Sequence, residues 1–193
     1  MFDIAGIITN HQRALGRRGT EEGEAYVLRL CRHYDAPIED VWDACTDPER
    51  IARWFLPISG DFRVGGRYQL EGNAGGTIGV CEPPRRLEVT WELYGGTSDL
   101  TVALSPGADG GTNFELEHVA VLPFTEEQYI DGIGGMAPGW EDALAGLEAH
   151  LRGDPRLTPA TGWYPPDSEE VERRWGALGQ VWRDLARAMF SKR

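Results

Sequence analysis

The 193-residue sequence has few cysteines and no long hydrophobic run. Its three cysteines, Cys31, Cys45 and Cys81, are odd in number, far apart and outside any C-x-x-C motif, so neither disulfides nor a structural metal site is expected. No apolar stretch approaches the roughly 18 residues of a membrane helix, and the N-terminus has no basic segment followed by an apolar one. We therefore expect a cytoplasmic protein without a membrane span.

Basic residues are also in deficit, with 19 Lys and Arg against 31 Asp and Glu and a net charge of -12. Such a chain repels phosphate backbones, which argues against nucleic acid as a partner. The sequence contains no G-x-S-x-G motif, phosphate-binding glycine loop or dinucleotide fingerprint. We expect no cofactor and no metal.

The composition predicts one globular domain with additions at both ends. Hydrophobic residues make up 41% of the chain and charged residues 26%, which excludes a disordered chain. The expected divisions are an N-terminal helical extension (1–24), a main domain (25–152), a linker (153–167) and a C-terminal amphipathic helix (168–193).

The first half of the chain reads as helix, strand and two short helices. Apolar residues at helical spacing predict a helix within residues 2–15, and alternation over residues 25–34 predicts the first strand. Ile38, Val41, Trp42 and Cys45 then recur at i, i+3, i+4 and i+7, which indicates a short helix after Pro37. A second helix is expected from Pro48 to Phe55, because the preceding Thr46 and Asp47 are capping residues.

The middle of the chain shows strand periodicity, interrupted by glycine and proline turns. The predicted strands are 67–71, 77–82, 86–94, 98–105 and 112–121, and their short connections indicate an antiparallel meander. After Pro123 a long helix is expected from Thr125 to Leu151, interrupted between Gly132 and Gly139. Segregated strands and helices of this kind are typical of the α+β class.

The C-terminal segment is strongly amphipathic. Val171, Trp175, Leu178, Trp182 and Leu185 recur at steps of four and three, so one side of this helix must be covered. Docking within the chain is the first expectation, and a homodimer through residues 168–190 is the alternative.

A series of ordered motifs across roughly residues 25–152 resembles the SRPBCC (START-like) superfamily, and more narrowly the homologues of the C-terminal domain of the heat-shock protein 90 ATPase activator. The motifs are Tyr34-Asp35-Ala36-Pro37, Val41-Trp42, Thr46-Asp47-Pro48-Glu49, Trp54-Phe55, Val64-Gly65-Gly66-Arg67-Tyr68, Pro83-Pro84, Val89-Thr90-Trp91, Gly111-Thr112 and Gly139-Trp140. The resemblance implies a helix-grip fold, in which a curved antiparallel sheet wraps around a long C-terminal helix and encloses a cavity. It does not fix the function, because this fold serves carriers, cyclases and chaperone regulators.

Strand alternation assigns a set of apolar and aromatic side chains to the inner face of the sheet, opposite the long helix. These candidate ligand-binding residues are Trp54, Phe55, Tyr68, Leu70, Trp91, Leu100, Phe114, Leu116, His118, Trp140, Leu144 and Leu147. They could equally fill an ordinary core. Five acids on the opposite parity, Glu71, Glu88, Glu92, Glu115 and Glu117, are expected to face solvent.

His118 is the one candidate for acid–base chemistry, because it shares strand parity with Phe114 and Leu116. A neutral, buried histidine bonded to Tyr68 or to the backbone is the more common arrangement, and no second catalytic group is evident. Cys81 could face the cavity, although an ordinary buried thiol is the more common case.

Three functions remain open. The first is a non-catalytic protein that binds a small apolar or aromatic ligand between the sheet and the long helix. The second is an enzyme resembling polyketide cyclases and aromatases that uses His118. The third is a regulator resembling the heat-shock protein 90 activator, with a chaperone as its partner.

Overall fold

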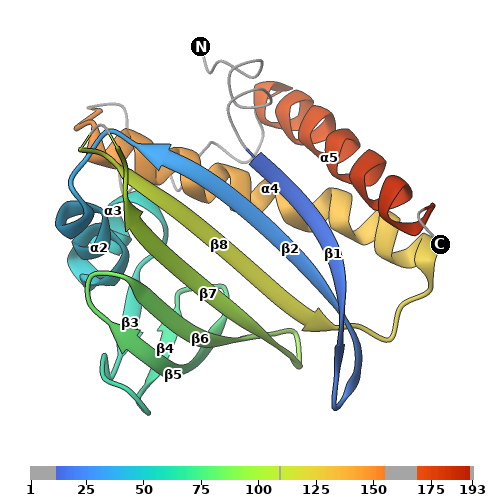
Figure 1. Ribbon diagram of the computed structural model, residues 1–193, viewed down its shortest axis with the longest axis horizontal. Coiled ribbons are helices and arrows are strands. Elements are labelled where there is room, and N and C mark those ends of the chain that lie inside the picture. The colour runs from blue at the N-terminus through green and yellow to red at the C-terminus, as the bar shows by residue number, and fades with distance from the viewer. Residues whose placement is uncertain (1–11, 109, 155–168, 192–193) are drawn as a thin grey trace.

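The computed structural model describes residues 12–108, 110–154 and 169–191. It has an eight-stranded antiparallel sheet in the order β1-β2-β8-β7-β6-β5-β4-β3 (Figure 1). The strands are β1 (Gln12–Thr20), β2 (Gly23–Tyr34), β3 (Ile58–Gly60), β4 (Arg67–Leu70), β5 (Gly75–Glu82), β6 (Arg86–Leu93), β7 (Gly96–Pro106) and β8 (Thr112–Val121). The helices are α2 (Ile38–Thr46), α3 (Pro48–Trp54), α4 (Glu126–Leu151) and α5 (Glu169–Phe190). This is the predicted α+β class and helix-grip fold.

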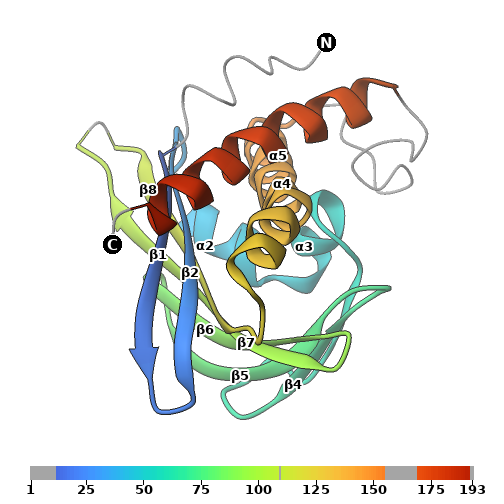
Figure 2. The same cartoon turned by 90° about the vertical axis from the view of Figure 1, so that its right-hand side faces the viewer.

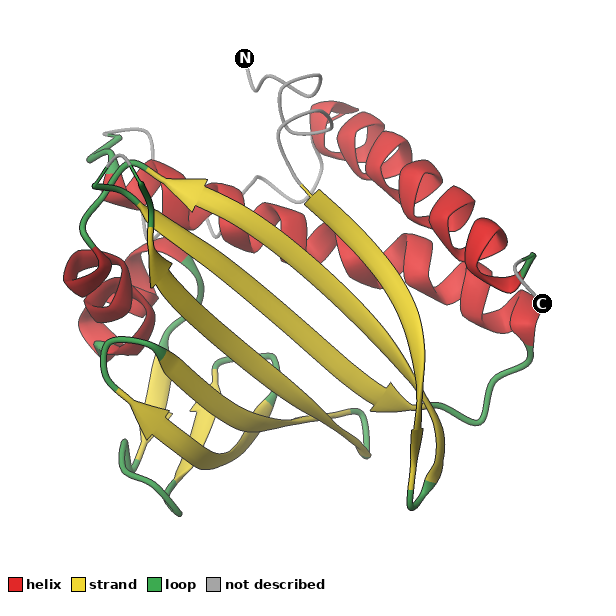
Figure 3. Cartoon of the chain, viewed as in Figure 1, coloured by secondary structure: helices red, strands yellow, loops and turns green. Residues whose placement is uncertain are grey.

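The sheet curls around α4, which lies along its concave side (Figure 2). Helices α2 and α3 cover one end of the sheet, between β2 and β3 (Figure 3). The side chain of Asp47 accepts hydrogen bonds from the backbone N–H groups of Glu49 and Arg50, so Asp47 rather than Thr46 caps α3. Thr46 instead donates its hydroxyl to the carbonyl of Trp42 at 2.8 Å.

The expected interruption of α4 is wrong, because the helix runs unbroken from Glu126 to Leu151. Thr125 and Gln128 form a reciprocal capping box at its start. Gly134, one of the glycines that suggested a break, packs closely on α5 instead: a Cβ added to it would meet the side chain of Arg183, and a Cβ added to Gly179 of α5 would lie 2.4 Å from the carbonyl oxygen of Gly134. Pro138 supplies no N–H to that carbonyl, and this leaves the Gly134 oxygen facing the neighbouring helix.

The predicted helix over residues 2–15 lies partly outside the described residues, and its described end is not helical. Residues 12–20 form β1, which pairs with β2 from Gln12 opposite Cys31 to Thr20 opposite Gly23. The spacing of Leu15 and the preceding isoleucines fits a helix locally. Pairing with β2 overrides that local preference, because the edge of β2 would otherwise present unpaired backbone groups.

Helix α5 packs on α4 and touches β1 within the same chain. Leu178, Trp182 and Ala186 are fully buried there, and Phe190 lies against the ring of Tyr129. Leu178 and Trp182 of the apolar stripe are therefore covered within the chain, whereas Trp175 is 38% exposed. A homodimer through this helix stays a prediction.

Buried ion pairs fix these outer elements to α4. The carboxylate of Glu141, which is fully buried, pairs with Arg13 of β1 and with Arg32 of β2, and it accepts a hydrogen bond from Trp182 Nε1 at 3.1 Å. The neighbouring Asp142 pairs with the buried Arg174 of α5. Buried charges require such partners, because they have lost their contact with water. These ion pairs therefore hold α5, β1 and β2 against α4.

Candidate functional site

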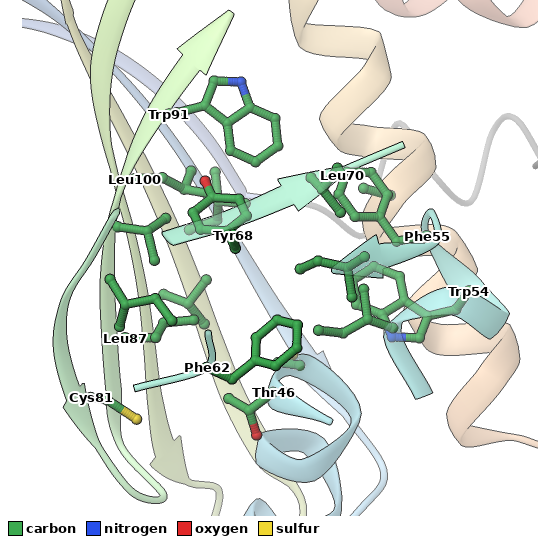
Figure 4. Close-up of a pocket in the computed structure, with 18 of the residues that line it drawn as sticks. Thr46, Trp54, Phe55, Phe62, Tyr68, Leu70, Cys81, Leu87, Trp91 and Leu100 are labelled. Atoms are coloured by element: carbon green, nitrogen blue, oxygen red, sulfur yellow. The ribbon is translucent and has the colours of Figure 1, made fainter. Parts of the chain in front are cut away.

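A cavity of about 170 Å³ lies between the inner face of the sheet and helices α3 and α4. Figure 4 shows Trp91 at one end of it and Phe62 and Thr46 at the other, with Leu87 and Leu100 on the sheet side and Trp54 and Phe55 opposite. The remaining walls come from β4, β5, β7, β8 and α4. The end at Phe62 is at the surface, because the side chain of Phe62 is 44% exposed.

Ten of the twelve candidate ligand-binding residues line this cavity. They are Trp54, Phe55, Tyr68, Leu70, Trp91, Leu100, Phe114, Leu116, Trp140 and Leu144. Leu147 is fully buried in the core and lines neither this cavity nor the groove described below. His118 lines that groove and not the cavity.

The sequence reading missed several other residues of the cavity wall. Leu87, Val89 and Val102 share strand parity with Trp91 and Leu100, so the signal for them was present. Ile51, Ile58 and Phe62 lie on α3, the short β3 and the following loop, where strand alternation gives no signal. Cys81 lines the cavity, but it is exposed rather than buried.

Several polar atoms in the cavity wall are bonded within the protein. The hydroxyl of Tyr68 donates to the carbonyl of Thr90 at 2.8 Å, and burial raises its pKa. Trp54 Nε1 donates to the carbonyl of Ala44 at 2.8 Å, and burial raises the pKa of the Cys45 thiol to about 12. Arg63 is the one charged residue of the wall within the described part of the chain, and its guanidinium pairs at the surface with Asp61. The interior therefore offers apolar and aromatic surface.

His118 is held as a neutral imidazole by a chain of three hydrogen bonds. Trp140 Nε1 donates to His118 Nδ1 at 3.2 Å, so the ring proton lies on Nε2. That nitrogen lies 2.7 Å from Ser98 Oγ, which in turn donates to the carbonyl of Trp91 at 3.2 Å. Burial lowers the pKa of His118 to about 4.

This geometry does not suit His118 for acid–base catalysis, because both ring nitrogens are already bonded to the protein. The partners differ from those expected, since neither Tyr68 nor the backbone bonds to the ring. The three hydrogen bonds instead connect α4, β8, β7 and β6, and they fix the orientation of the Trp140 indole. Trp140 lies 4.9 Å from the ring of Trp91 between centroids.

The outer face of the sheet carries ion pairs. This agrees with the expectation that the glutamates that alternate with the inward-facing residues point away from α4. Arg29 pairs with both Glu115 and Glu117, and Arg67 pairs with Glu92 at 2.7 Å. Among the described residues, no three His, Cys, Asp or Glu side chains gather in a way that could hold a metal ion. No helix in the described part of the chain is both long and apolar enough to span a membrane.

Comparison with known proteins places these features in a family. A family model described as "Activator of Hsp90 ATPase homolog 1-like protein" matches residues 35–152. The crystal structure of CalU16 from Micromonospora echinospora is 38% identical, with a TM-score of 0.72, over 92% of this chain and 98% of that one. Its solution structure is 41% identical, with a TM-score of 0.75, over 93% and 96%.

A more distant match is MLL2253 from Mesorhizobium loti, at 25% identity and a TM-score of 0.59, over 66% of this chain and 98% of that one. No curated protein matches the chain. The family match covers more than half of the sequence and includes α2, α3, β3 to β8 and α4. The chain therefore belongs to the family of proteins similar to the activator of Hsp90 ATPase homolog 1.

Proposed function

We propose that this chain is a non-catalytic, START-like binding protein that takes a small hydrophobic or aromatic ligand into the cavity between the sheet and α4. The observation that carries the proposal is the cavity itself, whose walls are aromatic and aliphatic and whose ring N–H and O–H groups at Trp54, Tyr68 and Trp140 are bonded within the protein. A wall of this kind recognises shape and apolar surface.

The cost of leaving the cavity empty supports the same conclusion. At about 24 cal/mol per Å³, a void of about 170 Å³ costs at most about 4 kcal/mol of folding free energy. This is a large share of the roughly 5–15 kcal/mol that stabilises a typical domain. A ligand that fills the cavity recovers part of this cost. An engineered cavity of about 150 Å³ binds benzene, so one or two fused rings are of the right size here.

The other two functions have less support. The cyclase alternative depends on His118, whose nitrogens are both bonded to protein and whose ring is outside the cavity wall. The chaperone alternative has no structural feature of its own that favours it.

Binding of indole, a neutral bicyclic probe, tests the proposal. At ten times its Kd, indole is expected to stabilise the protein by about 1.4 kcal/mol, which a thermal shift assay detects. Val102→Phe places a ring in the cavity and should abolish this shift, because Val102 lies on the inner face of β7. Thr101→Phe is the matched control, since Thr101 is the neighbouring residue on the outer parity and does not line the cavity.

Native mass spectrometry of freshly purified protein is the second measurement. We expect a copurified neutral small molecule in the wild type and its loss in Val102→Phe. The absence of any indole shift in the wild type, together with the absence of a copurified molecule, would contradict the proposed function.

A further inference from the structure

A second hollow, of about 580 Å³, lies next to the cavity, at the end where Trp91 stands. It is a groove bounded by the β6–β7 hairpin, the end of β8, the loop that follows it and the middle of α4. Phe55, Trp91 and Trp140 line both the groove and the cavity, so these three rings form a shared wall. Figure 4 shows Trp91 at the end of the cavity where this wall stands.

Among the residues that the structure describes, the seventeen that line the groove include no charged side chain, although 26% of the chain is charged. Its polar side chains are neutral and include Asn73, Thr97 and Ser98. Phe124 and Met136 leave 47% and 43% of their surface exposed at its rim. An exposed apolar surface of this kind marks a binding site, and the lack of charge indicates an uncharged occupant.

Tyr94, at the tip of the β6–β7 hairpin, adds an independent observation. Leu93 pairs with Gly96, so Tyr94 and Gly95 are the two loop residues, and both have positive φ angles, 51° and 80°. Such a turn favours Asn, Asp or Gly at its first position, and a tyrosine there is strained. Tyr94 is also 99% exposed, so its ring gains no burial in return. Because the residue lines the groove, a bound ligand could supply the missing contact.

From these observations we infer that the groove is a second subsite for the ligand of the cavity. The ligand class is an uncharged, elongated aromatic molecule. Its apolar head occupies the cavity and its longer body occupies the groove, with the ring of Tyr94 packed on that body. The rings of Trp91 and Trp140 lie 4.9 Å apart between centroids, so they must separate to let one molecule occupy both hollows. This inference rests on the proposed function. A volume of about 170 Å³ holds only the head of such a molecule, whereas the groove adds the space of a drug-sized site.

The test compares indole, which fits the cavity, with Nile red, a neutral fused-ring dye that is too long for it. We expect the wild type to bind one Nile red with a blue-shifted emission, and indole to compete with it. Ala120→Phe fills the groove without touching the cavity, because Ala120 lines only the groove. This variant should weaken Nile red binding at least tenfold and change indole binding less than twofold.

Tyr94→Asn keeps the inference testable if Ala120→Phe folds poorly. Asparagine suits the positive φ angle at the hairpin tip, so the variant should be as stable as the wild type or more stable. Loss of the ring contact should nevertheless weaken Nile red binding about two- to tenfold, with indole binding unchanged. A variant that gains stability and loses affinity distinguishes a binding residue from a structural one.

Charge selectivity is the third readout. The anionic dye 8-anilinonaphthalene-1-sulfonate should bind at least tenfold more weakly than Nile red, in 0.5 M NaCl to screen the net charge of the protein. Tighter binding of the anionic dye would overturn the uncharged class.

The failures of the two proposals are distinguishable. If the wild type binds indole but not Nile red, or if Ala120→Phe and Tyr94→Asn leave Nile red affinity unchanged, the subsite is wrong while the proposed function stands. If a dimer forms that Ala120→Phe dissociates, the groove belongs to a second copy of the chain and the inference is overturned. If neither probe binds, both proposals fail.

Discussion

The buried neutral His118 gives the protein a defined sensitivity to acid. The folded pKa of about 4 lies below the ordinary value of 6.5, so between these values the unfolded chain binds a proton that the folded chain does not. The free energy of unfolding therefore falls as the pH is lowered through this window, and the loss stops below about pH 4. A shift of this size is worth about 3 kcal/mol in total, and about 2 kcal/mol of it is lost between pH 7.5 and pH 5.

The environment of the ring explains why desolvation alone sets this value. The groups that contact His118 are Ser98, Trp91 and Trp140, none of which is charged. Protonation at Nδ1 would also remove the acceptor for Trp140 Nε1. A second histidine, His150, has a lowered pKa through burial and the nearby Arg50, so it contributes in the same direction.

Urea denaturation of the wild type and of His118→Gln at both pH values isolates the effect of His118. Glutamine can accept from Trp140 and donate to Ser98 but does not titrate, so the variant should lose about 2 kcal/mol less than the wild type between pH 7.5 and pH 5. His150→Gln is the control that removes the other contribution. Equal losses in the wild type and His118→Gln would refute a neutral, buried His118.

Three further predictions concern stability. Glu141→Gln should cost about 3–5 kcal/mol in urea denaturation because two buried arginines lose their counter-ion, whereas Glu92→Gln on the exposed face should leave the midpoint unchanged. Trp182→Ala should lower the free energy of unfolding by about 3–5 kcal/mol, because the side chain is fully buried. A smaller loss would show that α5 contributes less to the core than its burial indicates. Gly76→Ala should cost about 1–3 kcal/mol because an added Cβ would lie 1.9 Å from a backbone oxygen, and Gly16→Ala, with open space around it, should change the melting temperature little.

The sequence predicted most of the sheet and the inner face of the cavity because both depend on local alternation. Leu100, Phe114 and Leu116 follow the period of two, and the observed register places them on the face toward α4. The position of Phe62 could not be predicted in this way, because a loop has no periodicity and its path depends on the packing of α3 against β3.

The wrong predictions for β1 and for α4 have a different physical origin. Residues 12–15 fit a helix when read alone, and only the partner strand β2 makes them extended. The glycines at 134 and 139 read as helix breakers, although Gly134 permits the close approach of α5. In both cases a segment distant in the sequence decides the local structure, and a reading of neighbouring residues cannot include it.

The convergence of distant segments on Glu141 bears on what counts as the folding unit of this protein. The matched family segment spans residues 35–152, yet Arg13 and Arg32 precede it and Trp182 follows it. A polypeptide trimmed to the matched segment would retain an acid in its interior and lose every partner named here. The segment that the family model matches is thus smaller than the set of residues that pairs with its buried acid, and β1, β2 and α5 supply the partners from outside it.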